Sequence, residues 1–216
     1  MPLRAVLFDF DGTLVDTLDD IATAMNHALV ANDLDPHPTD AYRGLVGEGV
    51  GRLVERAIPA DRQELHEPVL DELRVYYTDH MIEESRPYPG VPELLDELTS
   101  RGIPMAVLSN KPHEATAWMV EQLLGDWEFA RVYGESTETP KKPDPAGALR
   151  IAGEVGIEPA DWLYLGDTKT DMQTASAAGM MPVGALWGFR DREELVDHGA
   201  RAVVERPGEV VELLEE

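Results

Sequence analysis

Short apolar runs alternate with amphipathic segments along most of the chain. Continuous apolar runs of strand length lie at residues 4–10, 103–110, 130–135, 161–167, 181–188 and 201–205. Runs of this kind are typical of strands that are buried on both faces. Helical spacing, with Pro near the start or Gly near the end, occurs between them at residues 90–102, 113–125 and 144–156. This alternation predicts an α/β fold, in which helices cover both faces of a parallel sheet.

One long interval, residues 17–86, departs from this alternation. It has helical patterning, clearest at 17–32 and 67–85, and no convincing strand. A crossover between parallel strands needs only about a dozen residues, so this interval predicts a small helical insert. The segment SRPYPG at 85–90 is the expected return to the core. The predicted domains are a core of residues 1–16 and 87–216 and an insert of residues 17–86.

Composition narrows the class of protein. The chain has 216 residues, 43% of them hydrophobic, no cysteine and a formal charge of −24. No apolar run approaches the ~20 residues of a membrane span, and the N-terminus enters a strand directly, so we expect a cytoplasmic protein without disulfides. The acidity disfavours nucleic acid and anionic membranes as partners. A solvated acidic surface and adaptation to high intracellular salt both explain the charge, and monomer and homodimer both stay open.

Polar residues gather at the predicted carboxyl ends of the strands. The set consists of Asp9, Asp11, Thr13, Ser109, Asn110, Lys142, Asp167 and Asp171. Each of them alone has an ordinary explanation as a turn, a helix cap or a surface lysine. Ligands of open α/β sheets bind beyond the carboxyl ends of the strands, so their shared position predicts one crevice. The four lysines of the chain, Lys111, Lys141, Lys142 and Lys169, all fall between residues 111 and 169.

The residue types in this crevice indicate phosphate chemistry. Carboxylates that converge on one point repel one another unless a cation lies between them, and oxygen-only ligands favour Mg²⁺. Mg²⁺ usually shares its coordination shell with a phosphate oxygen, and the Ser109 hydroxyl and Lys142 ammonium can hold the other oxygens. Asp9 is then placed to attack phosphorus, and Asp11 is placed to give a proton to the leaving oxygen.

The sequence resembles the haloacid dehalogenase superfamily over nearly its whole length. The segments DFDGTLVDT, VLSNKP, KKPDP and YLGDTKTDMQTASAAG are similar, in this order, to its four signature motifs. Within the superfamily the chain is most similar to the phosphoglycolate phosphatase group, which carries a small helical cap after the first motif. The resemblance implies a Rossmann-like parallel sheet with residues 17–86 as the cap.

The resemblance also implies roles for individual residues. It makes Asp9 the nucleophile and Asp11 the general acid and base, with the Asp11 backbone carbonyl on Mg²⁺. Ser109 and Lys142 resemble the phosphoryl-binding pair, Lys142 being preferred to Lys141 because it opens the Lys-Pro-x-Pro pattern. The implied metal set is Asp9, Asp11, Asp167 and Asp171. Thr13 and Asn110, within the same motifs, are expected at the substrate.

The implied function is a Mg²⁺-dependent phosphatase of a small phosphorylated metabolite, with phosphoglycolate as the first candidate. The second aspartate, Asp11, argues against dehalogenation, because the true dehalogenases of the superfamily lack it. A sugar phosphomutase of the β-phosphoglucomutase type uses the same motifs and stays an alternative. A non-catalytic protein on this fold is the third possibility, which the complete set of catalytic residue types disfavours.

Substrate selection is expected to come from the cap. Its glycine-rich segment, residues 42–57, suits a loop that faces the site. Arg52 is the first candidate to hold a substrate carboxylate and Arg43 the second, because a guanidinium forms a fork that fits a carboxylate. The alternative is a flexible loop that leads into a helix, with arginines that balance Glu48 and Glu55.

Overall fold

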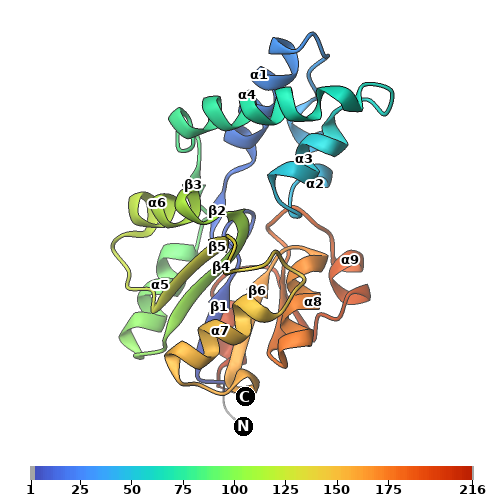
Figure 1. The fold of residues 1–216 in the computed structure, drawn as a ribbon. Helices are drawn as coiled ribbons and strands as arrows, with labels where there is room; N and C mark the ends of the chain where they lie inside the picture. The colour runs from blue at the N-terminus through green and yellow to red at the C-terminus, as the bar shows by residue number, and fades with distance from the viewer. Residues whose placement is uncertain (1–2, 216) are drawn as a thin grey trace.

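A six-stranded parallel sheet forms the centre of the molecule (Figure 1). The structure is a computed structural model that describes residues 3–215. The strands lie in the order β5-β4-β1-β6-β7-β8. Their bounds are β1 Ala5–Phe8, β4 Met105–Pro112, β5 Arg131–Glu135, β6 Trp162–Gly166, β7 Met181–Ala185 and β8 Ala202–Val204. All neighbouring pairs are parallel, so the carboxyl ends of these strands meet at one edge.

Helices cover both faces of the sheet because its central strands have apolar side chains on both sides. On β1, Val6 and Phe8 pack into one hydrophobic cluster, while Ala5 and Leu7 pack into another. The first cluster includes residues of α5 (Val91–Ser100), α6 (His113–Leu124) and α10 (Glu209–Leu213). The second includes residues of α7 (Ala146–Val155) and α8 (Lys169–Ala178), and α9 (Arg192–Asp197) lies against β7 and β8.

The helical insert stands beyond the carboxyl edge of the sheet (Figure 1). It consists of α1 (Leu18–Ala31), α2 (Tyr42–Leu45), α3 (Val50–Ala57) and α4 (His66–Asp79). Short 3-10 helices lie at Thr39–Ala41 and Gln63–Leu65 in the insert and at Pro159–Asp161 in the core. Apart from Phe189, the buried members of its hydrophobic cluster come from residues 18–73 of the described chain. The insert therefore has an apolar core of its own.

The chain enters and leaves the insert at one place. Strands β2 (Val15–Asp16) and β3 (Arg86–Pro87) form a short antiparallel pair there. Just beyond it the buried carboxylate of Asp20 in α1 accepts hydrogen bonds from the Ser85 amide (2.8 Å) and the Ser85 hydroxyl (2.6 Å). The two connecting segments are thereby joined by backbone and side-chain hydrogen bonds.

The predicted α/β fold is confirmed, and each of the six predicted runs overlaps a strand of the sheet, with β4 extending two residues beyond its run, to Pro112. The helix predicted at 67–85 ends earlier, at Asp79, and the amides of Glu84 and Ser85 donate to Asp20 of α1. Strands β2 and β3 were not predicted, since two residues are too few to show an alternation. We retain the division into core and insert domains as a proposal. Within residues 3–215 no helix has both the length and the apolarity needed to cross a bilayer.

Candidate active site

Three buried carboxylates meet at the carboxyl edge of the sheet. Asp9 follows β1, Asp167 follows β6, and Asp171 lies in the first turn of α8. One carboxylate oxygen from each lies within 4.8 Å of the others. Adjacent parallel strands bring Asp9 and Asp167 together, because β1 and β6 are hydrogen-bonded neighbours. The structure thus gathers three of the four residues predicted to form the metal site.

Lys142 lies at the centre of this cluster. Its ammonium is 2.7 Å from an oxygen of Asp9 and 2.7 Å from an oxygen of Asp171. Asn110 fixes the lysine's backbone, since its side-chain oxygen accepts from the Lys142 amide at 2.7 Å. The neighbouring Lys141 instead pairs with Glu135 at the surface. The placement agrees with the preference for Lys142 over Lys141.

Asp167 is held by groups from two loops. Thr13 donates its hydroxyl proton to one oxygen (3.0 Å), and the Phe189 amide donates to the other (2.8 Å). Glycine is required on both sides of this carboxylate. A Cβ on Gly12, whose φ is +83°, would lie 2.4 Å from an Asp167 oxygen, and one on Gly188 would lie 2.3 Å from the Asp167 Cβ. These contacts fix the carboxylate, and they place Thr13 against Asp167 rather than in the pocket lining.

Asp171 has a local structural role as well. Its carboxylate accepts hydrogen bonds from the Thr168 amide (3.0 Å) and hydroxyl (2.7 Å). The bond from the amide is one half of a capping box at the start of α8, in which the Thr168 side chain accepts from the Asp171 amide. The other carboxylate oxygen of Asp171 faces Lys142. The helix terminus therefore orients Asp171 towards the cluster, as expected for a supporting acid.

The side chain of Asp11 points away from the carboxylate cluster. One of its oxygens accepts from the Thr17 hydroxyl (2.8 Å) and lies 2.8 Å from the Lys111 ammonium. Lys111 in turn donates to the Tyr77 hydroxyl of α4 at 2.8 Å. Asp11 is thus connected to the helical insert through two side chains. This arrangement is compatible with a proton-transfer role for the Asp11 side chain, separate from the metal cluster.

Ser109 and Asn110 lie within β4, beyond Val107, the last residue of this strand that pairs with β1. Both side chains are buried and both residues line the pocket. The Ser109 hydroxyl oxygen accepts from the Lys111 amide at 3.2 Å. The Asn110 amide nitrogen donates to the Gly47 carbonyl of the insert at 3.0 Å, besides its contacts with Lys142. Asn110 therefore joins the loop that carries Lys142 to the loop between α2 and α3.

Burial and mutual repulsion disfavour the ionised carboxylates. Burial, followed by the nearby Asp171, raises the pKa of Asp9 well above its usual value and that of Asp167 to about 7. Burial alone would lower the pKa of Lys142, but Asp171 and Asp9 raise it well above its usual value. If all three carboxylates are ionised, the single positive charge of Lys142 does not neutralise them, and the cluster keeps a net negative charge.

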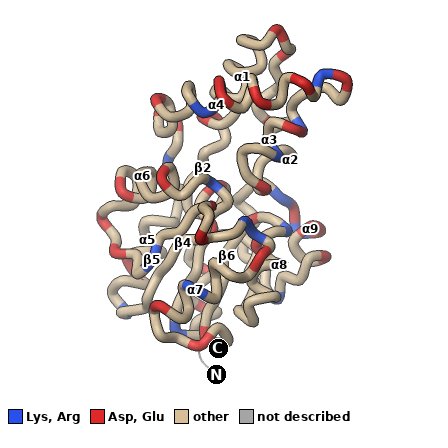
Figure 2. Tube along the Cα trace, viewed as in Figure 1, with Lys and Arg blue, Asp and Glu red and all other residues tan. Residues whose placement is uncertain are grey.

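Acidic residues are also frequent outside the site. Figure 2 shows Asp and Glu spread over both the insert and the core.

This donor set fits a hard divalent cation. The buried carboxylate oxygens converge without a His or Cys ligand, the combination that Mg²⁺ prefers. A divalent charge would offset the remaining negative charge and favour the ionised forms of Asp9 and Asp167. The structure thus supports a divalent metal site formed by Asp9, Asp167 and Asp171.

The pocket in front of Asp9 has a volume of about 710 Å³. The predicted residues Asp9, Asp11, Ser109 and Asn110 are among those that line it. Arg52 and Arg43 are not. Arg52 pairs with Glu55 on the exposed side of α3, and Arg43 donates to the Gly188 carbonyl at 3.0 Å. The structure does not bring these two arginines to the pocket, and their substrate-binding role stays a prediction.

Sequence reasoning assigned no role to Lys111, Arg74 or Tyr77, all of which line the pocket. The scarcity of lysine was a usable signal for Lys111, because the chain's other lysines also lie at or near the site. Lys169, for example, pairs with Glu48 of the loop that lines the pocket, at 3.2 Å. Tyr77 gave no signal, since an aromatic residue at helical spacing is equally expected in a core.

Comparisons with known proteins identify the family. The sequence profile of the haloacid dehalogenase-like hydrolases matches residues 6–185, and the chain belongs to this family. Phosphoglycolate phosphatase of Neisseria meningitidis is 36% identical over 195 residues, which are 88% of this chain and 83% of that protein. N-acetylmuramic acid 6-phosphate phosphatase of Pseudomonas aeruginosa is 34% identical over 219 residues, covering 100% of this chain and 96% of that protein.

A solved structure gives the same result. The crystal structure of a candidate phosphoglycolate phosphatase from Lactobacillus delbrueckii subsp. bulgaricus superposes with a TM-score of 0.94 at 30% identity, over 99% of both chains. The predicted family is therefore confirmed. So is the enzyme class, phosphoric monoester hydrolase, since the relatives are named as phosphatases and the chain matches the solved structure over 99% of both chains.

Proposed function

We propose that this protein is a Mg²⁺-dependent phosphatase that hydrolyses a small phosphomonoester through an aspartyl phosphate on Asp9. The observation that carries the proposal is the placement of Asp9, which lines the pocket and touches both Lys142 and the buried carboxylate cluster. Phosphoglycolate is the first candidate substrate, because relatives at 31–36% identity are named for it.

The residues divide the reaction into two steps. An oxygen of Asp9 attacks phosphorus, the bond to the alcohol oxygen breaks, and Asp11 gives its proton to that oxygen. Asp11, now a carboxylate, takes a proton from water, whose oxygen attacks the phosphoryl group and releases phosphate and the Asp9 carboxylate. When bound, Mg²⁺ supplies charge that offsets the repulsion between the carboxylates and the phosphate. Lys142 and Ser109 hold phosphoryl oxygens through both steps.

The decisive test is to trap the phosphoryl group on the enzyme. Enzyme in excess over substrate is quenched with acid during a single turnover, and its peptides are weighed by mass spectrometry. We expect a phosphate mass on the peptide that contains Asp9, absent from Asp9→Asn. With a substrate that has a good leaving group, such as p-nitrophenyl phosphate, this mass should persist in Asp11→Asn, which retains the nucleophile but lacks the acid that a poor leaving group needs. Asp9→Asn should also lose about 10⁴-fold or more in kcat, as expected for a missing nucleophile.

Two controls separate the alternatives. Turnover should stop in EDTA and return with Mg²⁺, whereas Ca²⁺, which prefers a larger and looser shell, should restore little of it. Unmodified peptides from an enzyme that consumes substrate rapidly would make Asp9 a metal ligand only. An isomerised sugar phosphate in place of inorganic phosphate would identify a phosphomutase.

A further inference from the structure

The pocket changes character away from Asp9. Its inner end carries the polar groups of Asp9, Asp11, Ser109 and Lys111. Its outer part is lined mainly by apolar side chains, which are Ile21, Val46, Val50, Leu53, Leu73, Met81, Ala115 and Trp118. A volume of about 710 Å³ lies in the range of pockets that enclose molecules of many atoms, far more than a two-carbon acid has.

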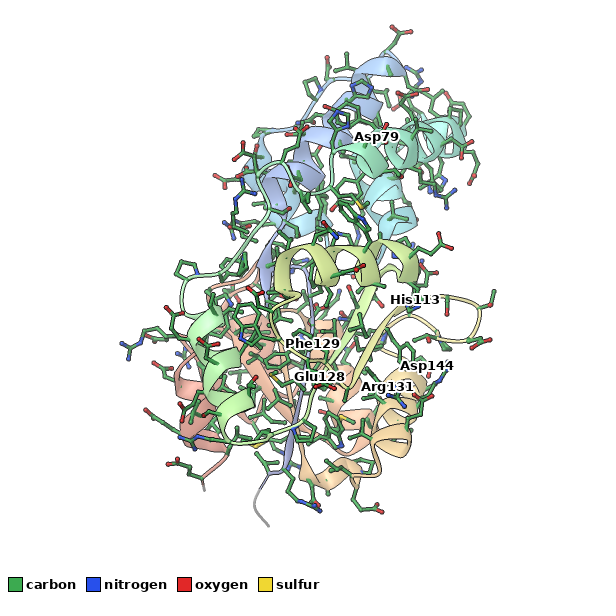
Figure 3. All side chains as sticks on the ribbon, turned by 90° about the vertical axis from the view of Figure 1, so that its left-hand side faces the viewer. Asp79, His113, Glu128, Phe129, Arg131 and Asp144 are labelled. Atoms are coloured by element: carbon green, nitrogen blue, oxygen red, sulfur yellow. The ribbon has the colours of Figure 1, made fainter. Side chains whose placement is uncertain are left out.

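Both parts of the molecule contribute to the outer walls. Val50, Leu53 and Leu73 come from α3 and α4 of the insert, while Ala115 and Trp118 come from α6 of the core. In both ribbon views α6 lies between the insert and the sheet (Figures 1 and 3). The insert contacts the core through the Asn110–Gly47 and Lys111–Tyr77 hydrogen bonds. The space between the walls therefore exists while the insert and the core are in contact.

Trp118 is the largest apolar side chain of this outer wall, and it is 39% exposed. Its helical neighbours Met119 and Val120 are buried against the sheet, so the phase of α6 directs Trp118 to the other side. A single exposed apolar residue is ordinary, but this one lies in a cavity continuous with the phosphoryl end. An indole at such a place offers a flat, rigid surface on which a ring can stack.

The charges of the pocket do not favour a short anionic substrate over a larger one. Its basic lining residues are Lys111 and Arg74. Lys111 is paired with Asp11 at 2.8 Å, and Arg74 lies 3.7 Å from Asp71. Glycolate also has no apolar face, so it would leave the walls of the outer pocket in contact with water.

On the basis of the phosphatase function proposed above, we propose that the preferred substrate is a phosphomonoester whose alcohol carries an apolar face of ring size or larger. Trp118 packs against that face and selects it. The phosphate lies at Asp9, and the alcohol extends between α4 and α6. This substrate class is larger than phosphoglycolate and buries the apolar walls that phosphoglycolate leaves exposed.

The test compares esters that differ only in the ring. Ethyl phosphate and 2-phenylethyl phosphate are both primary alkyl esters, and phosphoglycolate is the third substrate. We expect kcat/KM for 2-phenylethyl phosphate to exceed that of the other two by about 10-fold or more, the range of a well-filled apolar pocket. Trp118→Ala should lower kcat/KM for 2-phenylethyl phosphate about 10-fold more than for ethyl phosphate. Val75→Ala is the matched control, since Val75 is 68% exposed on α4 and does not line the pocket.

The outcomes separate this inference from the function on which it rests. If none of the three esters is hydrolysed with Mg²⁺ present, the phosphatase function and the inference both fall. If phosphoglycolate is hydrolysed with a kcat/KM equal to or above that of 2-phenylethyl phosphate, the phosphatase function stands and the inference is overturned. An equal loss for both alkyl esters in Trp118→Ala would also overturn the role of Trp118.

Discussion

The inner end of the pocket is formed by charged and polar side chains, whereas its outer end is formed mainly by apolar ones. At the inner end, the carboxylates of Asp9 and Asp171 contact the Lys142 ammonium, and Asp167 lies beside them with its oxygens bonded to Thr13 and Phe189. At the outer end, apolar side chains from two separate hydrophobic clusters face each other across open space. The inner end therefore depends on fixed charges and the outer end on shape and apolar area, which respond to different perturbations.

Replacing the ammonium group of Lys142 should have the largest effect on the stability of the inner end. Lys142→Met leaves Asp9 and Asp171 without their buried counter-charge, so at pH 8 without metal we expect a loss of about 3–5 kcal/mol in the free energy of unfolding. We also expect kcat/KM to fall by about 10²-fold or more. Urea unfolding and phosphate release measure the two effects.

The adjacent lysine supplies the control for this substitution. Lys141 is 37% exposed and pairs with Glu135 at 3.3 Å, so Lys141→Met should cost less than about 1 kcal/mol. Equal losses in the two variants would contradict the distinction between a charged inner end and its surroundings, and would also contradict the choice of Lys142 as the phosphoryl-binding lysine.

The second test uses pH. Because burial raises the pKa of Asp167 to about 7 from its ordinary value of 3.8, the folded state holds a proton that the unfolded chain releases. In EDTA, the contribution of Asp167 to the free energy of unfolding should therefore fall as pH rises from 4 to 7, by up to about 1.4 kcal/mol per pH unit. Above pH 7 it should level off. Asp167→Asn removes the titration, so the variant should gain stability relative to the wild type across that window.

Urea unfolding of both proteins at pH 5, 6, 7 and 8 gives the difference directly. Mg²⁺ at pH 8 should stabilise the wild type more than Asp167→Asn, because the ion favours the ionised carboxylate. A stability difference that stays constant with pH would mean that Asp167 is ionised throughout, and that the inner end needs no cation to keep it so.

The smallest effect concerns the arginines of the insert. Arg52 is paired with Glu55 at an exposed position outside the pocket lining, so Arg52→Ala should change KM for phosphoglycolate by less than about 2-fold. Arg74, which lines the pocket, is the comparison, and Arg74→Ala should change it more. A selective rise of KM for phosphoglycolate over ethyl phosphate in Arg52→Ala would instead support Arg52 as the residue that holds the substrate carboxylate.

The sequence allowed the inner end to be predicted because strand order and strand ends determine it. A polar residue directly after a buried parallel strand lies at a known edge, whatever the loops do, and this holds for Asp9 and Asp167. The outer end follows no such rule. Arg52 was chosen for its charge, but α3 turns Leu53 and Val54 inward and Arg52 outward. The sequence does not distinguish Trp118 and Tyr77 from core residues, and only the packing of α4 over α6 makes them pocket walls.

The antiparallel pair β2–β3 has a consequence for how such a protein can diversify. The chain leaves the core at Val15–Asp16 and returns at Arg86–Pro87, on positions paired across two strands. A coding segment exchanged between these two points would replace the whole helical insert without interrupting any strand of the six-stranded sheet. Domain insertions are tolerated where the two ends lie close together, and this junction meets that condition. The insert, with the pocket walls that α3 and α4 contribute, can thus be exchanged as one unit while the carboxylate cluster and α6 of the core stay in place.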